Sequence, residues 1–481
     1  MSDDRLPSAG AVFAALPPPQ ADGAVLRASI RSMRASDGVL AGVLDDDPTG
    51  SQAMHDVQVV LALSQRACEA ALGGPSGACF VLTNSRSMES GAAAGVTARA
   101  ARLLIAAASR RGERIQLVSR SDSTLRGHVM PEIAALQSVR SEVAGAGFDA
   151  VLLIPAFLEA GRLTAADIHW ARTSAGLVPA GATEFARDPA FAYTSSDLKD
   201  FLAEKSGGQI APAEVASISI ADIRTGGPDR VRELLAGLRN GRWAVVNATE
   251  YSDLETVACG ALLAERAGQR FAFRTGPSFV RALTGTEPAE PLRGERLWPD
   301  GRRAGHGLIV VGSHVGQTSR QLAVLRERAD VTGIELSVPV IVGGGQDAAA
   351  MAARRVTGAL RRSHVVLYTS RAVAAAASAA DSLKIARTVS AAVARTVRLA
   401  RPARPAWILA KGGITAHDVA VHGLGIRRAE VAGQLLPGLI SVFRPVDASP
   451  EAIGMPYVVF AGNVGDDQTL AQVAGILDGS H

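Results

Sequence analysis

The chain is poor in cysteine and in long apolar runs. Its 481 residues include three cysteines, Cys68, Cys79 and Cys259, which are too few and too widely spaced for a cysteine-based zinc cluster or a disulfide framework. No uninterrupted apolar run approaches the roughly 18 residues of a membrane span, and the first residues carry acids where a signal peptide carries bases. We therefore expect a cytoplasmic protein with no membrane partner.

An excess of charge of one sign is also lacking. Fifty Lys and Arg stand against 46 Asp and Glu, which leaves a formal net charge of +4. So small an excess, spread over the whole chain, excludes a nucleic-acid coat, and we expect no nucleic-acid partner. Lysine is rare, so a chemical step that needs a titratable amine has few candidates. The lysines are Lys199, Lys205, Lys384 and Lys411.

From Val39 onward the sequence repeats one pattern. A short β-branched run is followed by a cluster of Gly, Ser, Asp or Thr and then by a longer stretch with helical spacing. Many runs are apolar throughout, which is typical of parallel strands buried on both faces. The pattern predicts an α/β fold class with two domains, each with a largely parallel sheet flanked by helices. The expected strands are 39–44, 57–63, 79–82, 115–119, 150–155, 243–247, 307–312, 338–342, 365–368, 406–410 and 457–460. The expected helices are 90–111, 228–238, 254–267, 318–328, 348–362 and 381–399.

Two shifts in composition suggest domain boundaries. The first residues are rich in Ala, Pro and Ser with little periodicity, so we predict an N-terminal arm over 1–38. Between Gly285 and Gly307 the sequence turns to Pro, Glu, Arg and Gly, which predicts a linker. The predicted domains are therefore 39–290 and 305–481.

Three consecutive acids, Asp45, Asp46 and Asp47, follow the first predicted strand and precede Pro48-Thr49-Gly50. Adjacent carboxylates repel one another, a cost best explained by a bound metal ion, by a hydroxyl that needs a base, or by both. An acidic turn closed by Pro and Gly would give the same sequence.

A second polar cluster, residues 119–128, follows the predicted strand 115–119. Its hydroxyls, its acid and its two arginines could hold a polyhydroxylated anion, with arginine as a fork for a carboxylate. A helix start capped by Asp122 or Ser123 explains the same residues. For a third group, Thr183–Asp188, we expect salt bridges at the surface.

Glycine-containing clusters follow predicted strands in the second half, at 312–318, 411–415 and 462–467. Small residues between a strand and a helix let backbone N–H groups and a helix N-terminus face a phosphate. None matches the P-loop or the dinucleotide fingerprint. Together they favour a nucleotide, because ligands gather at the carboxyl ends of parallel strands.

In this order the clusters resemble the four-carbon acid sugar kinases, a family once catalogued as of unknown function. Asp46–Gly50 is similar to that family's D-D-x-T-G and Asp122–Gly127 to its D-S-T-L-R-G. Gly312-Ser313 resembles the opening of its G-S-x stretch, Gly412–Thr415 resembles G-G-x-T, and Gly462–Gly465 resembles the terminal G-N-x-G. The resemblance covers nearly all of the chain after the arm.

The resemblance implies that 39–290 binds the sugar acid and that 305–481 binds ATP. Phosphate would pass to the terminal hydroxyl of a four-carbon acid sugar (erythronate, threonate or 3-oxo-tetronate type) at a cleft between the domains. One of Asp46 and Asp47 would accept the hydroxyl proton and its neighbour would help to place Mg²⁺; spacing does not rank them. The implied substrate-binding residues are Asp122, Ser123 and Arg126. The implied nucleotide-binding residues are Ser313, Gly412, Gly413, Ile414, Thr415, Gly462 and Asn463.

The chain departs from many relatives at two places. Ile414 stands where they have an acid, and Phe460-Ala461 where they have Lys-Ser. Lys411, arginines or Mg²⁺ are then left to balance the phosphate charge. A homodimer is the expected assembly, since it is the commonest oligomer.

Two other functions remain open. A non-catalytic sensor could hold nucleotide and sugar acid without turnover, but it has no need of three adjacent carboxylates. A dehydrogenase would fit a parallel sheet, but an early strand followed by G-x-G-x-x-G is lacking.

Overall fold

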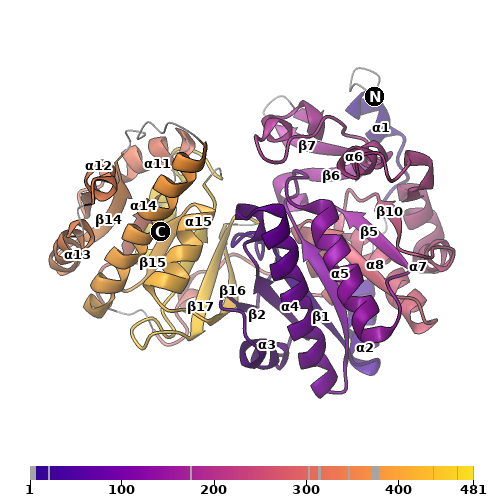
Figure 1. Ribbon diagram of the computed structural model, residues 1–481, viewed down its shortest axis with the longest axis horizontal. Helices are drawn as coiled ribbons and strands as arrows, with labels where there is room; N and C mark the ends of the chain where they lie inside the picture. The colour runs from indigo at the N-terminus through magenta and orange to yellow at the C-terminus, as the bar shows by residue number, and fades with distance from the viewer. Residues whose placement is uncertain are drawn as a thin grey trace. The chain divides into compact units, whose positions relative to one another are not determined.

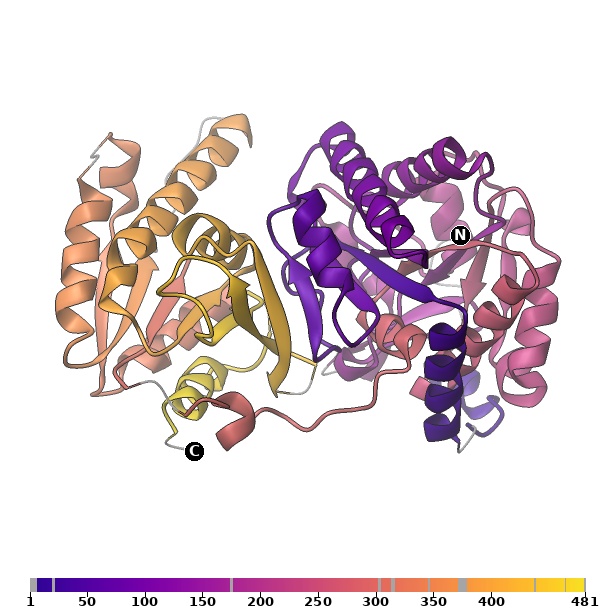
Figure 2. The ribbon, with the colours of Figure 1, turned by 90° about the horizontal axis from the view of Figure 1, so that it is seen from below.

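The computed structural model describes residues 7–19, 22–173, 176–301, 304–312, 316–344, 347–370, 379–436, 438–462 and 464–479. The chain divides into two compact units. Unit 1 comprises residues 1–57 and 63–288, and unit 2 comprises 58–62 and 289–481. Each unit has a sheet flanked by helices (Figures 1 and 2). The predicted α/β fold class is therefore confirmed.

The sheet of unit 1 is parallel throughout. Its strands lie in the order β3, β1, β4, β11, β5, β10, β9. Because all of them run the same way, their carboxyl ends share one edge of the sheet. The bounds are β1 (Val39–Asp45), β3 (Ala78–Leu82), β4 (Arg114–Arg120), β5 (Ala150–Ile154), β9 (Ala216–Ile218), β10 (Arg242–Val246) and β11 (Phe271–Thr275).

Helices cover both faces of this sheet. On one face α4 (Ser90–Arg110) packs against α3 (Gln65–Leu72) and α5 (Val129–Ala144), and on the other α8 (Tyr251–Arg266) packs against α2 (Gly23–Ser36), α7 (Ile220–Ala236) and α9 (Pro277–Thr284) (Figure 1). By length and composition α4 could cross a membrane. Its Ala100, Leu104 and Ala107 are nevertheless fully buried in unit 1, as in the core helix of a folded domain.

The prediction of a loose arm over 1–38 is wrong for the described part of that segment. In α2, Ile30 is fully buried and Met33 is nearly so, and α2 lies on α8. Val12 of α1 (Ala9–Ala14) joins a small core with Ile168 and Trp170. The apolar positions are few and stand among Ala, Ser and Arg, so their helical spacing gives a weak signal.

A second, antiparallel sheet of unit 1 was not predicted. It consists of β6 (Arg162–Ala165), β7 (Ile168–Thr173) and β8 (Gly176–Pro179), and it is followed by α6 (Leu198–Lys205). Its strands mix polar and apolar residues without a clear alternation, so no strand pattern marks them in the sequence.

The sheet of unit 2 is parallel over β13, β14, β12, β15 and β18, and then continues through antiparallel β17 and β16 to β2. Helices α11 and α16 pack together beside it, and α14 packs against α12, α13 and α15. The strand bounds are β2 (Val57–Val60), β12 (Leu308–Val311), β13 (Val331–Leu336), β14 (His364–Thr369), β15 (Ile408–Lys411), β16 (Arg428–Leu436), β17 (Ile440–Asp447) and β18 (Tyr457–Phe460). The helix bounds are α10 (Gly294–Leu297), α11 (Gly316–Arg326), α12 (Val338–Val342), α13 (Ala348–Ala359), α14 (Ala379–Ala400), α15 (Gly413–Asp418) and α16 (Thr469–Asp478).

Strand β2 comes to this sheet from far away in the sequence. The chain leaves unit 1 after residue 57, joins unit 2 over 58–62 and then returns. The Leu61 amide donates to the Arg427 carbonyl at 2.9 Å, and the Arg428 guanidinium donates to Gln58 Oε1 at 2.7 Å. Unit 2 is therefore built from two separate pieces of the chain.

The strand predicted over 338–342 is wrong, because these residues form helix α12. Pro339 lies in its first turn, where proline suits a helix. Val338 and Ile341, one turn apart, are buried, whereas Val340 and Val342 are exposed. A short apolar run fits either structure, and here the proline was the decisive signal.

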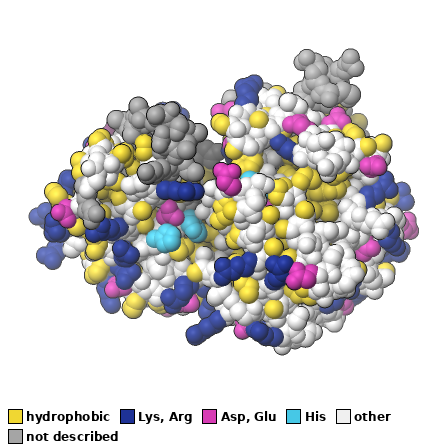
Figure 3. Space-filling view, in the orientation of Figure 1, with side chains coloured by type: hydrophobic (Ala, Val, Ile, Leu, Met, Phe, Trp, Pro, Cys, Tyr) yellow, Lys and Arg dark blue, Asp and Glu magenta, His cyan; other side chains and the backbone are white. Residues whose placement is uncertain are grey.

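Acidic and basic side chains are interspersed on the face of the molecule drawn in Figure 3. The described side chains on that face form no continuous basic stripe of the kind that follows a nucleic-acid backbone.

Candidate active site

The polar clusters of unit 1 meet at the carboxyl edge of its sheet. Asp45 ends β1 and pairs in register with Arg120, the last residue of β4. On the other side of β4, Thr275 ends β11 and is also in register with Arg120. Parallel pairing therefore places the acids after β1 beside the residues after β3, β4 and β11.

Asp45 is a buried structural carboxylate. Its Oδ1 accepts a hydrogen bond from Arg120 Nη1 at 2.9 Å, and its side chain is 4% exposed. A Cβ on Gly50 would lie 2.1 Å from this oxygen, so only glycine leaves room for the carboxylate. Burial raises the pKa of Asp45 to about 7, against the opposing effect of Arg120.

Asp46 is held by Arg86, which lies just after β3. Arg86 Nη2 is 2.6 Å from Asp46 Oδ1 and Nε is 3.1 Å from Oδ2, so the guanidinium binds both carboxylate oxygens. The Asp46 side chain is 2% exposed. Burial raises its pKa even though Arg86 opposes that shift.

Asp47 is the most exposed of the three acids, at 22% of its side chain. Its Oδ1 accepts hydrogen bonds from the Thr49 amide at 2.9 Å and from Thr49 Oγ1 at 2.5 Å, while Oδ2 is 3.6 Å from Arg86 Nη1. Burial alone would raise the pKa of Asp47, but Arg86 and Thr49 outweigh burial and hold it below its usual value. Asp47 is thus an ionised carboxylate with one oxygen that no described residue hydrogen-bonds.

Arg126, predicted to bind the substrate, already faces two carboxylates. Its Nε donates to Asp122 Oδ2 at 2.6 Å, and its Nη1 is 3.4 Å from Asp188 Oδ2. Its guanidinium also lies 5.2 Å from the centre of the Phe185 ring. The expectation of plain surface salt bridges for Thr183–Asp188 is therefore incomplete, because this group packs around Arg126.

The neighbouring predicted residues are mostly buried. Asp122 accepts from Arg126 and from Thr124 Oγ1; burial would raise its pKa, but Arg86 and Arg126 hold the pKa well below the usual value. The backbone carbonyl of Ser123 lies 2.7 Å from Nε2 of His169, a fully buried residue of β7. The small sheet therefore fixes the loop that follows β4.

The sequence motifs assigned no role in the site to Arg86 or Arg274. Arg274 is 1% exposed, and its Nη1 donates to Ser119 Oγ at 2.7 Å and to the Glu132 carboxylate. Its Nη2 is buried and has no hydrogen-bond partner among the described residues. A Cβ on Gly127 would lie 3.1 Å from Arg274 Nη2 and 3.1 Å from Asp46 Oδ2, so both groups point at this glycine, whose φ is +116°.

Both arginines lie at or just after the carboxyl end of a strand, which is where ligands gather in a parallel sheet. Arg86 follows β3 within a polar Asn-Ser-Arg-Ser stretch, and Arg274 is the penultimate residue of β11. The polar residues at strand ends are the signal, but only the strand order places these two beside Asp46.

Glycine turns of unit 2 meet at the carboxyl edge of its own sheet. Lys411, at the end of β15, is in register with Val311 of β12 and with Phe460 of β18. The Gly412 amide donates to the Phe460 carbonyl at 2.8 Å, and Thr318 Oγ1 donates to the Gly462 carbonyl at 2.9 Å.

Two of these positions require glycine for different reasons. A Cβ on Gly312 would lie 2.3 Å from Thr415 Oγ1, and the φ of Gly412 is +106°, a backbone conformation that other residues rarely adopt. Gly413 begins helix α15, and the Ile414 side chain beside it is 57% exposed. The structure thus brings Gly412, Gly413, Ile414, Thr415 and Gly462 together, whereas Ser313 and Asn463 lie outside the described residues.

Lys411 is the cation inside this edge. Its side chain is fully buried, its Nζ donates to the Ala461 carbonyl at 2.9 Å, and Nζ lies 3.7 Å from the centre of the Phe460 ring. Burial lowers the pKa of Lys411 to about 7. The ammonium therefore lies between the glycine turns that follow β15 and β18.

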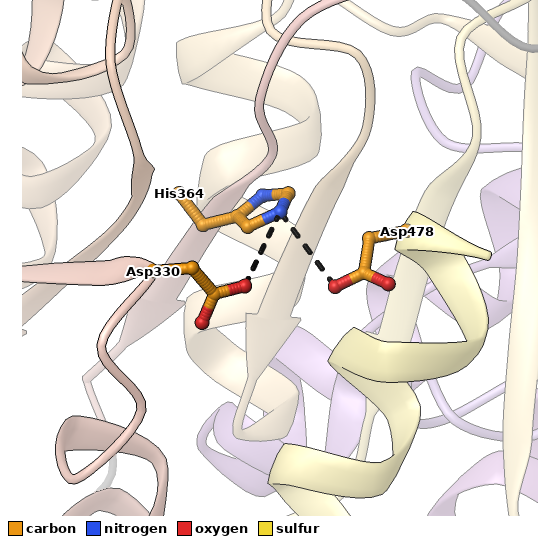
Figure 4. A group of neighbouring side chains, drawn as sticks. All are labelled: Asp330, His364 and Asp478. Carbon is orange, nitrogen blue, oxygen red and sulfur yellow. Dashed lines mark ion pairs between the residues drawn. The ribbon is translucent and has the colours of Figure 1, made fainter. Parts of the chain in front are cut away.

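A cluster of Asp330, His364 and Asp478 at the opposite edge of this sheet has the composition of a metal site (Figure 4). His364 Nδ1 accepts the Gly307 amide at 2.8 Å, so in the neutral ring Nε2 carries the proton and cannot ligate a metal. Arg328 donates to both carboxylates, at 2.7 Å and 2.8 Å. We interpret the cluster as an ion network that anchors the end of α16.

Comparisons with known proteins give one family match for each of the two units. A family described as "Sugar-binding N-terminal domain" matches residues 41–283, and one described as "Nucleotide-binding C-terminal domain" matches residues 308–470. The fold and the matches define a protein with a sugar-binding and a nucleotide-binding domain. The chain belongs to the four-carbon acid sugar kinase family.

The individual proteins that resemble this chain share 16% to 30% sequence identity with it. A D-erythronate kinase of Heliobacterium modesticaldum is 30% identical over 205 residues, which span 42% of this chain and 41% of that kinase. The match thus covers less than half of the relative's length. A Haemophilus influenzae protein of a family of unknown function has a TM-score of 0.61 and 18% identity over 91% of this chain and 100% of its own. A protein of Salmonella typhimurium LT2 has a TM-score of 0.64 and 16% identity over 90% and 98%, respectively. These two share the fold.

Proposed function

We propose that the protein is an ATP-dependent kinase that phosphorylates the terminal hydroxyl of a four-carbon acid sugar of the erythronate, threonate or 3-oxo-tetronate type. The family and the D-erythronate kinase relative support the reaction class. The observation that carries the proposal is the arrangement of the three acids, which leaves one ionised and partly exposed carboxylate, Asp47, at the carboxyl edge of the sugar-binding unit.

In the proposed reaction Asp47 is the general base. The terminal hydroxyl of the sugar acid gives its proton to Asp47 as its oxygen attacks the γ-phosphorus of ATP. The bond between that phosphorus and the bridging oxygen of ADP breaks, and the phosphorylated sugar acid and ADP leave. Asp46 serves as a positioning residue, because both of its oxygens are bound by Arg86.

The residues that would bind the sugar acid lie in β11 and in the loop after β4, at the same edge of the sheet as Asp47. Arg274 Nη2 is buried, has no hydrogen-bond partner among the described residues, and offers a donor to a carboxylate or hydroxyl. Arg126 can pair with the substrate carboxylate at the cost of its 3.4 Å contact with Asp188. Asp122 and Ser123 shape the same loop and complete the proposed substrate site.

The glycine turns of unit 2 would hold the nucleotide. Backbone amides around Gly412, Gly413 and Thr415 can approach phosphates, as can those near Gly462. Ile414 offers an exposed apolar side chain to the nucleoside. Lys411 supplies positive charge, and Ser313 and Asn463 extend the proposed site by sequence alone.

Unit 1 offers few free ligands to a Mg²⁺ that arrives with the nucleotide. Arg120 and Arg86 bind Asp45 and Asp46, and the oxygen of Asp47 that no described residue hydrogen-bonds is the proposed proton acceptor, so the phosphates and waters would supply most of the ligands of Mg²⁺. Mg²⁺ often binds through one or two carboxylates and substrate phosphates, and it keeps several waters. When bound, it neutralises charge on the phosphates.

The test is an assay of ADP formation with ATP, Mg²⁺ and a panel of erythronate, threonate and 3-oxo-tetronate stereoisomers. We expect ADP formation that depends on one acid sugar. We further expect Asp47→Asn to lower kcat by about 10²–10⁴-fold, the usual contribution of a general base, with ATP binding nearly unchanged.

The matched control is Asp56→Asn, which makes the same charge change at an exposed position. It should keep the normal rate. ATP binding without turnover on any acid sugar would instead identify a sensor, and a normal rate in Asp47→Asn would remove Asp47 as the base.

A further inference from the structure

A cavity of about 260 Å³ opens at the amino edge of the sheet of unit 1, the edge opposite Asp47. Val39 and Arg114, the first residues of β1 and β4, lie at this cavity, and α4 and α5 contribute its sides. Its volume is below the roughly 300–1,000 Å³ of sites for drug-sized ligands, so a nucleotide is too large for it. The kinase function proposed above makes no use of this cavity.

Three arginines line the cavity without carboxylate partners. Neither Arg114 nor Arg140 nor Arg270 forms an ion pair with a carboxylate in the described part of the chain. Arg140 Nε is buried and has no hydrogen-bond partner among these residues. Arg270 Nη1 donates to the backbone carbonyl of Glu265 at 2.9 Å, and the Glu265 carboxylate interacts with Arg270 only through space.

Two acids, Glu113 and Glu265, also line the cavity. Glu113 pairs with Arg111 at 2.5 Å. Glu265 Oε2 accepts from Gln116 Nε2 at 3.0 Å, and Gln116 Oε1 in turn accepts from the buried Arg34 at 2.5 Å. Because Arg111 pairs with Glu113, the three lining arginines face one further acid, Glu265, and the lining keeps a net positive charge.

Holding this charge is unfavourable in the free protein. Burial and the nearby positive charge of Arg270 lower the pKa of Arg140, and the Glu265 and Asp149 carboxylates oppose this shift only in part. A bound anion would remove both effects, because it would pair with the guanidinium groups and replace the water they lose.

The remaining walls are apolar. Ile105 of α4, Val143 of α5 and Phe148 line the cavity, and the Phe148 ring centre lies 5.3 Å from the Arg140 guanidinium. A ligand that satisfies both walls has an anionic head and a short apolar body. Arginine forks suit a carboxylate and a phosphate equally well.

We propose that this cavity is a binding site for a small organic anion, with its carboxylate or phosphate head at Arg114, Arg140 and Arg270 and its apolar body against Ile105, Val143 and Phe148. The site lies at the opposite end of β1 and β4 from the candidate active site, so its ligand and the sugar acid bind at separate places. Occupancy ties the start of β4 to the ends of α4 and α5 and stabilises unit 1.

The test is isothermal titration calorimetry on the full chain with n-butyl phosphate, hexanoate, inorganic phosphate and n-butanol. We expect one-to-one binding of hexanoate or butyl phosphate, weaker binding of inorganic phosphate and none of butanol. Binding of hexanoate alone identifies a carboxylate site, and binding of butyl phosphate alone identifies a phosphate site. A chain that binds neither organic anion overturns the proposal.

Two variants locate the binding. Arg140→Gln should weaken it roughly ten-fold or more, as expected for the loss of a charge-assisted hydrogen bond. Ala144→Trp keeps every arginine and places a large side chain at the exposed end of α5, so it should block entry.

Arg66→Gln, on the exposed surface of α3, makes the same charge change away from the cavity and should leave binding unchanged. An equal loss in Arg66→Gln and Arg140→Gln, or full binding in Ala144→Trp, would mean that the anion binds elsewhere and would overturn the proposal. Thermal denaturation of each variant confirms that it is folded.

Discussion

Arg86 binds both oxygens of the Asp46 carboxylate, with Nη2 2.6 Å from Oδ1 and Nε 3.1 Å from Oδ2. The same guanidinium lies 3.6 Å from Asp47 Oδ2. Arg86 thus binds the Asp46 carboxylate at both oxygens and leaves Asp47 Oδ2 without a hydrogen bond from any described residue. The spacing of the two acids in the sequence does not distinguish them.

Removing this arginine should destabilise the fold. Arg86→Ala leaves Asp46 buried without its partner, and we expect a loss of about 3–5 kcal/mol, the usual effect of breaking a buried ion pair from one side. Urea denaturation measures the change. Arg102→Ala, which breaks the exposed pair with Glu142, should have little effect. Equal stability of the two variants would contradict the assignment of Arg86 as the residue that holds Asp46.

Replacing Arg274 should weaken acid-sugar binding selectively. Arg274→Lys keeps a positive charge beside Glu132 but removes Nη2, which no described residue hydrogen-bonds. We expect KM for the acid sugar to rise about 10–100-fold, as for a lost charge-assisted hydrogen bond, with a smaller change in kcat. Steady-state kinetics at saturating ATP measure both constants.

The control for Arg274→Lys is Arg224→Lys. Arg224 is also buried and ion-paired, with its Nε 2.8 Å from Asp253 Oδ1, but it lies outside the candidate site. The KM of Arg224→Lys for the acid sugar should stay unchanged. A normal KM in Arg274→Lys would exclude Nη2 from substrate binding.

Lys411 should make stability depend on pH. Its folded pKa is about 7 and its ordinary value is 10.5, so between these values the unfolded chain holds a proton that the folded chain does not. The cost of burying the charge is therefore fully present below pH 7 and is lost as the pH rises toward 10.5. It amounts to at most a few kcal/mol, since one pKa unit corresponds to about 1.4 kcal/mol.

We expect Lys411→Met to be more stable than the native protein at pH 6, with a difference that shrinks steadily between pH 7 and pH 10. Denaturant unfolding of both proteins at several pH values measures it. A difference that does not change with pH would show that the Lys411 charge is not under strain from burial.

The sequence predicted most of the central strands but missed β11, which lies between β4 and β5, and it predicted the connecting elements poorly. Strands such as β1 and β18 are apolar at nearly every position, which is typical of parallel strands buried on both faces. In contrast, β13 has Thr, Gly and Glu along its length and is only partly buried, so its pattern is weak. Its existence depends on pairing with β14, a long-range contact that no local pattern contains.

The same reasoning applies to the candidate site. The rule that ligands gather at strand ends located Asp46, Asp47, Gly412 and Gly462 from single segments of sequence. It could not tell Asp46 from Asp47, because that difference depends on Arg86, which comes from a neighbouring strand end some 40 residues away. Pairing between segments, rather than residue type, separates the two acids.

The sheet of the nucleotide-binding unit includes β2, which lies early in the chain, before most of the sugar-binding unit. A polypeptide cut at the linker would leave β16 as an open edge with unsatisfied amides and carbonyls, ready to pair with another molecule. We therefore expect a cut at residue 289 to expose this edge of the second half, and a split that carries residues 58–62 along with the second half to keep it covered.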